Sequence, residues 1–179
     1  VNSVKLLNKL GFSSLSEKEK FNPKKIDFYE IKNSKKICDL DISEFNSDDY
    51  KYTTLKRSKL LQFLIDGLDK STIQFNCSLD KIEYSNDSIN FTINKEKITC
   101  DQLIISDGVF SKGKSLISNN YSEPIYNNTI AVRASISKES LDNINEENIS
   151  LFLGSDFHYV LYPLTVSYTH LRAHETLAD

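Results

Sequence analysis

The residues best suited to bind a polar ligand lie in residues 103–114, with the sequence LIISDGVFSKGK. An apolar run passes directly into Ser-Asp-Gly, and a helix is predicted over residues 112–117. A carboxylate at Asp107 accepts hydrogen bonds from sugar hydroxyl groups, and Gly108 lets a ligand approach the backbone. Ser111 caps the helix, whose first amide groups favour a phosphate. The alternative is an ordinary strand-to-helix turn, in which Asp, Gly and Ser are all common.

A second group of candidate residues lies at the start of the strongest predicted helix, over residues 54–68. Lys56, Arg57 and Lys59 occupy its beginning, where positive charge opposes the helix dipole. An anion bound nearby would explain them, and so would a solvated basic face. The sequence leaves both explanations open.

The remaining nucleophilic and metal-binding residue types favour no site. The cysteines are odd in number, widely spaced and without a C-x-x-C motif, so we read them as free thiols in a reducing compartment. They are Cys38, Cys77 and Cys100. His158 lies in a predicted strand and is interpreted as structural, while His170 and His174 lie in a terminal segment discussed below. We predict no metal site, and no acid, base or nucleophile can be assigned, so the catalytic residues are unknown.

Composition narrows the class of protein. Hydrophobic residues make up 39% of the chain and charged residues 26%, as in ordinary globular domains. The formal net charge of −3 disfavours a general nucleic-acid binder, and no apolar run approaches the length of a membrane span. The chain begins with Val1, and residues 166–176 match the translation of a common sequencing-library adapter. We therefore expect a fragment of a longer protein, in which residues 166–179 are a non-biological tail.

The elements that must position these residues are mostly strands. Residues 25–31 and 36–42 alternate apolar and polar side chains around a polar turn, which predicts a β-hairpin. Further strands are predicted over residues 72–75, 79–84, 88–93, 97–105, 129–137, 149–153 and 158–164. Residues 103–105 are continuously apolar, as in a strand of a parallel sheet that is covered on both faces. A first helix is predicted over residues 2–11.

The order of these features resembles the FAD-dependent aromatic hydroxylases of the p-hydroxybenzoate hydroxylase type. It is most similar to the branch that hydroxylates ring intermediates of ubiquinone biosynthesis. In that family a helix beginning R-x-x-L-x-x-x-L precedes a small strand meander, and Arg57, Leu60 and Leu64 fit this pattern. The resemblance spans most of residues 1–165. It rests on the order and spacing of the motifs, because each motif is short.

The second family motif is an apolar strand that ends in D-G-x-x-S-x-x-R. Asp107, Gly108 and Ser111 match it, and Lys114 stands where the family has arginine. Lysine keeps the charge but loses the bidentate geometry of a guanidinium. Two more family motifs, an amino-terminal G-x-G-x-x-G and a later G-D segment, would lie outside residues 1–165. We therefore expect the chain alone to bind FAD poorly and to be inactive.

The resemblance implies an α/β fold. We expect part of a three-layer FAD/NAD(P)-binding fold, made of a parallel sheet, a small antiparallel meander and helices. This part would lead into a mostly antiparallel sheet of a substrate domain. The expected domains are a partial FAD-binding domain over residues 1–124, without its glycine-rich fingerprint, and the start of a sheet-rich substrate domain over residues 125–165.

The resemblance also implies a function for the whole protein: an FAD-dependent monooxygenase that uses NAD(P)H and O₂ to hydroxylate an aromatic ring in ubiquinone biosynthesis. The residues that it assigns to FAD are Asp107, Gly108, Arg57 and Ser111, and those that it assigns to the substrate are Tyr162 and Pro163. Of these, Ser111 is expected to act as a helix cap rather than as a direct ligand. Arg57 could instead be a surface residue at a helix start.

The expected partners are small molecules rather than nucleic acid. A substrate of the ubiquinone branch is a small, prenylated aromatic compound, and it implies a cytoplasmic protein loosely attached to the inner membrane. A homo-oligomer and a biosynthetic complex both stay open. The alternatives to a hydroxylase are a reductase or halogenase of the same fold, or a non-catalytic α/β module in which D-G-x-x-S is only a turn.

Overall fold

The computed structural model describes residues 2–47, 50–85, 87–118, 120–137, 145–164 and 168–176. Contacts divide the chain into two compact units. The first unit comprises Val1–Leu68 and Asn128–Asp179, and the second comprises Asp69–Asn127. The chain thus leaves the first unit after α2 and returns to it just before β8, which begins at Thr129.

The first unit contains most of the regular structure. Its helices are α1 (Asn2–Asn8) and α2 (Arg57–Asp66), with short 3₁₀ helices η1 (Phe12–Ser14) and η2 (Ser43–Phe45). Its strands are β1 (Lys20–Phe21), β2 (Lys25–Glu30), β3 (Lys36–Asp41), β4 (Thr54–Leu55), β8 (Thr129–Ser137), β9 (Ile149–Leu153), β10 (Phe157–Pro163) and β11 (Tyr168–Thr176). Within the described residues, no helix of either unit is long and apolar enough to cross a membrane.

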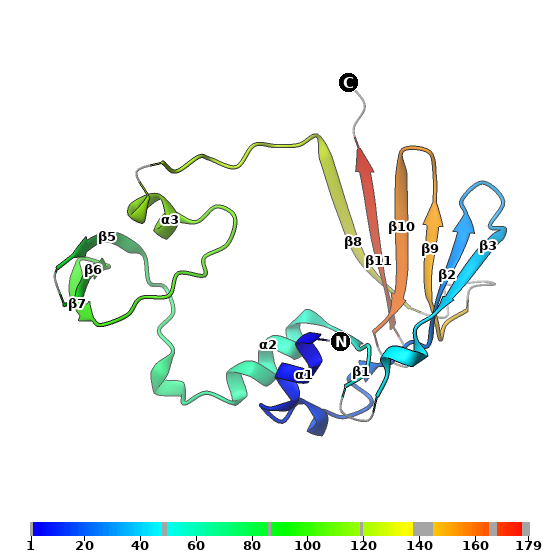
Figure 1. The fold of residues 1–179 in the computed structure, drawn as a ribbon, viewed down its shortest axis with the longest axis horizontal. Coiled ribbons are helices and arrows are strands. Elements are labelled where there is room, and N and C mark those ends of the chain that lie inside the picture. Colours follow the sequence, from blue (N-terminus) through cyan, green and yellow to red (C-terminus); the bar gives the residue numbers. More distant parts are fainter. Residues whose placement is uncertain are drawn as a thin grey trace. The chain divides into compact units, whose positions relative to one another are not determined.

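Six strands of the first unit form one sheet, in the order β3-β2-β9-β10-β11-β8 (Figure 1). The predicted hairpin is confirmed as β2 and β3, and residues 129–137 and 149–153 are strands over the predicted bounds. All neighbours pair antiparallel except β2 and β9, which are parallel. This parallel pair joins the early hairpin to strands more than a hundred residues later, which the local pattern did not predict.

Part of the core of the first unit lies on β9 and β10 of this sheet, and Phe12 packs against Phe63 of α2. The buried apolar side chains of this unit are Phe12, Ile42, Ile149, Phe152, Leu161 and Leu164. The Phe152 ring stacks between two tyrosines, with its centroid 4.9 Å from Tyr29 and 4.4 Å from Tyr159. The three residues are direct cross-strand neighbours, so their side chains share one face of the sheet. Burial raises the pKa of Tyr29 and of Tyr159.

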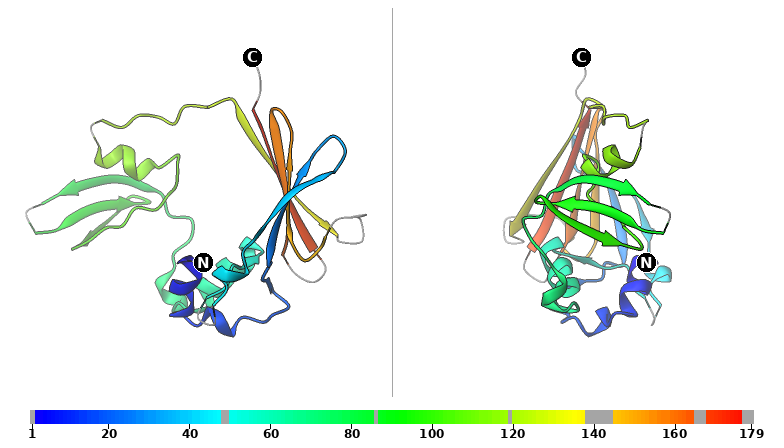
Figure 2. Two further views of the ribbon diagram at one scale, coloured as in Figure 1. Left: turned by 45° about the vertical axis from the view of Figure 1, so that its right-hand side comes forward. Right: turned by 90° about the vertical axis from the view of Figure 1, so that its left-hand side faces the viewer.

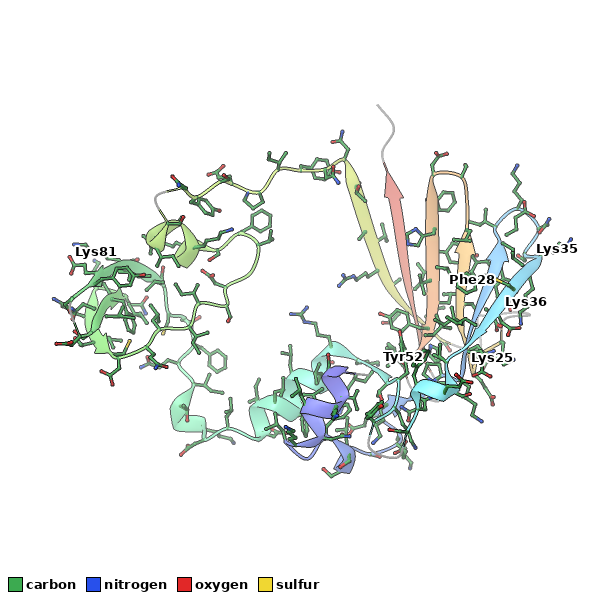
Figure 3. All side chains as sticks on the ribbon, in the orientation of Figure 1. Lys25, Phe28, Lys35, Lys36, Tyr52 and Lys81 are labelled. Carbon is green, nitrogen blue, oxygen red and sulfur yellow. The ribbon has the colours of Figure 1, made fainter. Side chains whose placement is uncertain are left out.

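One carboxylate is buried in the same region. Asp27 is only 1% exposed, and its charge is compensated by Lys36, whose Nζ lies 2.8 Å from Oδ1. Asn148 Nδ2 donates a hydrogen bond of 2.8 Å to Oδ2. Hydrogen bonds to Asp27 and then to Asp39 raise the pKa of Lys36. Lys36 and Lys25, both labelled in Figure 3, lie on the β2–β3 hairpin, so these ion pairs fix the edge of the sheet.

The second unit is small. Its elements are η3 (Lys70–Thr72), β5 (Leu79–Tyr84), β6 (Ile89–Ile93), β7 (Glu96–Cys100) and α3 (Lys112–Ile117). The three strands form an antiparallel meander in chain order (Figure 2). The meander and the bounds of α3 agree with the sequence predictions. α3 contacts β5, and Lys112 Nζ lies 3.3 Å from Asp80 Oδ1.

Two strand predictions in the second unit are wrong. Residues 72–75 and 103–105 form no strand. Among the described residues no strand pairs with 103–105, and Ile104 is 87% exposed. A strand needs a neighbour for its backbone hydrogen bonds, so an apolar run without one stays irregular.

The domain boundaries stay predictions. The contact units divide the chain after Leu68 and before Asn128, and the large sheet draws strands from both predicted domains. The predicted tail also stays a prediction. Residues 168–176 form β11, which pairs with β10 on one side and with β8 on the other. Residues 166, 167 and 177–179 of that segment lie outside the described residues.

Candidate functional site

The D-G-x-x-S motif forms a closed hydrogen-bonded turn in the second unit. The Ser111 hydroxyl donates to Asp107 Oδ1, and the Gly113 amide donates to Asp107 Oδ2 over 2.9 Å. Ser111 Oγ also accepts from the Lys114 amide over 2.8 Å, which is the hydrogen bond of a helix N-cap. The hydrogen bond from Ser111, followed by that from Gly113, lowers the pKa of Asp107. The predicted role of Ser111 as a helix cap is thus confirmed.

Two glycines give this turn its shape. Gly108 has a φ of 86°, a conformation that other residues adopt only with strain, and no atom lies within 4 Å of the position of a Cβ. Gly113 has the opposite environment, because a Cβ there would lie 2.6 Å from Ile105 Cγ2 and 3.3 Å from Asp107 Oδ2. The turn is therefore closed on the side of α3 and open beside Gly108.

A cavity of about 470 Å³ lies in the first unit, where the start of α2 faces β8 and the end of β10. We call it the α2–β8 cavity. It is lined by Leu55, Lys56, Arg57, Ser58, Leu60, Arg133, Ser135, Tyr162 and Leu164. Among the described residues, the lining thus combines three cationic side chains, three hydroxyl groups and three leucines, without a carboxylate.

Several contacts hold the start of α2 at this cavity. The Thr54 hydroxyl donates to the carbonyl oxygen of Pro163, which ties β4 to the end of β10. β4 pairs with β1, and Lys59 Nζ lies 2.6 Å from Glu19 Oε1. The Phe63 ring meets the Phe12 ring edge-on, with centroids 5.4 Å apart. The basic charge of Lys59 therefore has a protein partner, which answers part of the question raised by the basic helix start.

The structure brings some of the predicted site residues together. Arg57 and Tyr162 line the same α2–β8 cavity. Pro163 is fully buried, and its carbonyl oxygen holds Thr54. Asp107, Gly108 and Ser111 share the turn of the second unit, and their assignment to FAD stays a prediction.

Sequence reasoning missed two lining residues and one glycine. Arg133 and Ser135 lie two residues apart on β8, so a strand places both on one face. That alternation was visible in TIAVRASIS, but the sequence did not show that β8 and the start of α2 line one cavity. Gly113 was missed because glycine is needed there only to leave room for the side chains of Ile105 and Asp107, which lie earlier in the chain. Within the described residues, no group of three or more His, Cys, Asp or Glu side chains could hold a metal ion.

Comparison with known proteins places the fold. No family model matches the chain, and no curated protein matches it significantly. Among solved structures, HpxO of Klebsiella pneumoniae in complex with FAD and uric acid matches with a TM-score of 0.84 and 14% identity, over 99% of this chain and 46% of HpxO. A salicylate hydroxylase–substrate complex matches with a TM-score of 0.80 and 14% identity, over 100% of this chain and 47% of that one.

A third similar structure is 2,6-dihydroxypyridine-3-hydroxylase from Arthrobacter nicotinovorans. Its TM-score is 0.79 and its identity 12%, over 98% of this chain and 45% of the hydroxylase. The chain therefore spans about half the length of the structures that it matches. At these identities the likeness concerns the fold, and it confirms the predicted class: a mixed α/β chain with the fold found in FAD-binding hydroxylases.

Proposed function

We propose that this chain is part of an FAD-dependent monooxygenase that hydroxylates an aromatic ring. The observation that carries the proposal is the shared fold, which extends over nearly the whole chain in three structures named as hydroxylases or bound to FAD. The net reaction consumes NAD(P)H, a proton, O₂ and the ring compound. It yields the hydroxylated ring, NAD(P)⁺ and water.

The residues of the chain fit a flavin nucleotide. Arg57 presents a guanidinium to the α2–β8 cavity, and this group suits phosphate and carbonyl oxygens. The open space beside Gly108 lets a ligand approach the backbone. Asp107 is exposed, and an ionised carboxylate has acceptor sites beyond the two that Ser111 and Gly113 use. FAD, when bound, supplies the redox chemistry, and these residues bind and orient it.

Each proposed residue has a distinct task. Arg57 holds the flavin nucleotide by charge, and Asp107 accepts hydrogen bonds from its sugar hydroxyl groups. Ser111 keeps the Asp107 carboxylate in place and caps α3. Tyr162, whose side chain lines the α2–β8 cavity, contacts the substrate, and Pro163 fixes the end of β10 behind it.

The finer proposal concerns the pathway. We place the whole protein in ubiquinone biosynthesis, where it would act on a prenylated ring at the cytoplasmic side of the inner membrane. The support is the match of Arg57, Leu60 and Leu64 and of the D-G-x-x-S motif to the family pattern. HpxO, which holds uric acid, supports a small ring compound as substrate but not this pathway.

The test is to purify the full product of the gene that contains this chain and to measure flavin content, oxidation of NAD(P)H and ring hydroxylation. We expect bound or reconstitutable FAD, and hydroxylated product that depends on O₂. Arg57→Gln should weaken FAD binding about tenfold or more, since it removes a charged hydrogen bond. The matched control is Lys5→Gln, on the exposed side of α1. A protein that neither contains nor takes up flavin would overturn the proposal.

One observation favours a second candidate, the non-catalytic α/β module. Both oxygens of Asp107 already accept hydrogen bonds inside the turn, so the motif has a sufficient structural role. This candidate predicts no flavin in the purified protein. A reductase or halogenase of the same fold is distinguished by its product, because neither incorporates oxygen into the ring.

A further inference from the structure

A second cavity of the first unit lies where α1 and η1 meet β1 and residues 50–53. We call it the α1–β1 cavity. Its volume is about 190 Å³, and none of the residues proposed above for the flavin or the substrate lines it. The side chains that give the cavity its chemical character are Phe12, Ser13, Glu17, Lys20, Asn22 and Thr53.

Lys20 places a buried positive charge in the wall of this cavity. Only 9% of the residue is exposed. Lys20 Nζ donates to the carbonyl oxygen of Ser13 over 3.3 Å and lies 3.2 Å from Glu17 Oε1. The Phe12 ring, with its centroid 6.0 Å from Nζ, supplies an aromatic face but no acceptor atom. An ammonium group has three N–H donors, so one donor has no acceptor among the described residues, and a buried donor of this kind favours an anionic ligand group.

The carboxylate that pairs with Lys20 is itself replaceable. The Glu17 side chain is 79% exposed, although the Lys20 side chain that it contacts is buried. An ion pair with one partner in solvent contributes little to stability, so a ligand carboxylate can take the place of Glu17 on Lys20 at small cost. Glu17 then remains at the cavity as a negative charge, available to a positive group of the same ligand.

Asn22 adds an acceptor whose position is fixed. Its Nδ2 donates to the carbonyl oxygen of Tyr52 over 3.0 Å and to Thr53 Oγ1 over 2.9 Å. The Thr53 hydroxyl in turn donates to the carbonyl oxygen of Lys51 over 3.0 Å. Both N–H donors of the Asn22 amide are thus used within the protein, which leaves Oδ1 as the atom that can bind a ligand. An amide oxygen suits an ammonium group.

The size of the cavity limits the ligand. At about 30 Å³ for each molecule of liquid water, a volume of about 190 Å³ holds about six non-hydrogen atoms. The volume lies below the usual range for sites that bind drug-sized molecules, so a flavin nucleotide or a substituted ring is too large. An inorganic anion would satisfy Lys20 but would leave the acceptors of Glu17 and Asn22 unused. The ligand should therefore carry both charges on a very small skeleton.

We infer that the α1–β1 cavity binds a small zwitterion, an α-amino acid of about the size of alanine. Its carboxylate binds Lys20, and its ammonium group binds Glu17 and Asn22. This site is additional to the proposed function and needs neither the flavin nor the aromatic substrate, so its failure would leave the flavin content of the protein unchanged.

The experiment measures binding to the full product of the gene that contains this chain, by equilibrium dialysis. L-Alanine is the probe, L-lactate replaces its ammonium group by a hydroxyl group, and L-alaninamide replaces its carboxylate by an amide. We expect alanine to bind about tenfold or more tightly than either analogue, as for a hydrogen bond between charged groups.

Two variants assign the charges to their residues. Glu17→Gln should weaken alanine binding about tenfold, because it removes the partner of the ammonium group. The same variant should bind lactate as tightly as the unmodified protein or more tightly, because Lys20 is then free of its competing carboxylate. Lys20→Gln should weaken the binding of both ligands. Glu96→Gln, an exposed substitution on β7, is the control, and circular dichroism checks the fold of each variant.

The exposed position of Glu17 keeps the test decisive even if Lys20→Gln does not fold. A last arm adds inorganic phosphate at a concentration equal to that of alanine, and we expect it to leave alanine bound. Displacement by phosphate would overturn the inference in favour of a plain anion site. Equal binding of alanine and lactate, no measurable binding of alanine, or full affinity for alanine in Glu17→Gln would each overturn it as well.

Discussion

The two units of the chain bury their apolar side chains to very different extents. All six buried apolar residues of the described chain belong to the first unit. In the second unit large apolar side chains stay exposed, among them Phe75, Ile104, Phe110 and Ile125, with exposures of 74%, 87%, 81% and 93%. Stability in the first unit thus comes from packing across the sheet, and in the second from local hydrogen bonds and strand pairing.

The difference also appears in the polar residues. In the first unit, Asp27 of β2 is buried. It pairs with Lys36 on the neighbouring strand β3 and accepts a hydrogen bond from Asn148, which lies 121 residues later in the chain. In the second unit, Asp107 is exposed and binds Ser111 and Gly113, within six residues of itself. The candidate binding residues follow the same division. The α2–β8 cavity needs the tertiary fold, whereas the D-G-x-x-S turn closes by itself.

The largest expected effect is a difference in unfolding free energy between alanine substitutions of one phenylalanine from each unit. Phe152→Ala should lower the free energy of unfolding by about 3–5 kcal/mol, because it removes a ring stacked between Tyr29 and Tyr159 and leaves a cavity. Phe110→Ala should change it by about 0.5 kcal/mol or less, because that ring is already exposed. Urea unfolding followed by circular dichroism measures both. Equal losses would contradict the assignment of the core to the first unit.

The second prediction compares alanine substitutions at one glycine of each unit, Gly154 in the first and Gly113 in the second. A Cβ on Gly154 would lie 2.9 Å from the carbonyl oxygen of Phe157, which is fixed by the hairpin. Gly154→Ala should therefore cost about 1–3 kcal/mol in unfolding free energy.

A Cβ on Gly113 would lie 2.6 Å from Ile105 Cγ2, so the Ile105 side chain must move to another rotamer. Alanine also gains up to about 1 kcal/mol of helix propensity, which offsets part of that cost, so Gly113→Ala should cost less than Gly154→Ala, about 1 kcal/mol or less. Urea unfolding of both variants gives the difference. A loss at Gly113 as large as that at Gly154 would show that the second unit is as tightly packed as the first.

A cap substitution tests whether the second unit depends on local hydrogen bonds. Ser111→Ala removes the acceptor of the Lys114 amide and the donor to Asp107, and it should cost about 1 kcal/mol. Faster hydrogen exchange at the α3 amides, without change in the large sheet, is the expected result. Ser115→Ala, in the same helix, is the control, since its hydroxyl group donates only to the carbonyl of Lys112. Exchange that rises equally in both variants would exclude capping as the cause.

Local features were predictable from the sequence and distant ones were not. The hairpin, the meander, α3 and the Ser111 cap depend on neighbouring residues, so side-chain alternation and turn residues identified them. The parallel pairing of β2 with β9 and the place of Arg133 depend on contacts across the chain, which no local pattern contains. The strand predicted over residues 103–105 failed for a related reason, since an apolar run specifies burial but not the partner that would provide it.

The smallest expected effect is a loss of stability at alkaline pH. It should be confined to the first unit, because the buried tyrosines lie there. Burial raises the pKa of Tyr29 and of Tyr159 above the ordinary value of 10.0, and both lie in the first unit. The folded protein therefore holds these protons more tightly than the unfolded chain. Their contribution to stability is complete below pH 10 and is lost as the pH rises through the raised values.

In the second unit, by contrast, Tyr84 is exposed to solvent. Hydrogen exchange above pH 10 should thus increase in the large sheet relative to the meander, after correction for the intrinsic exchange rate. Tyr159→Phe should remove its share of this increase while keeping the stacked ring. If hydrogen exchange in the large sheet increased with pH to the same extent in this variant and in the unmodified chain, burial of the Tyr159 hydroxyl group would not be the cause of the increase.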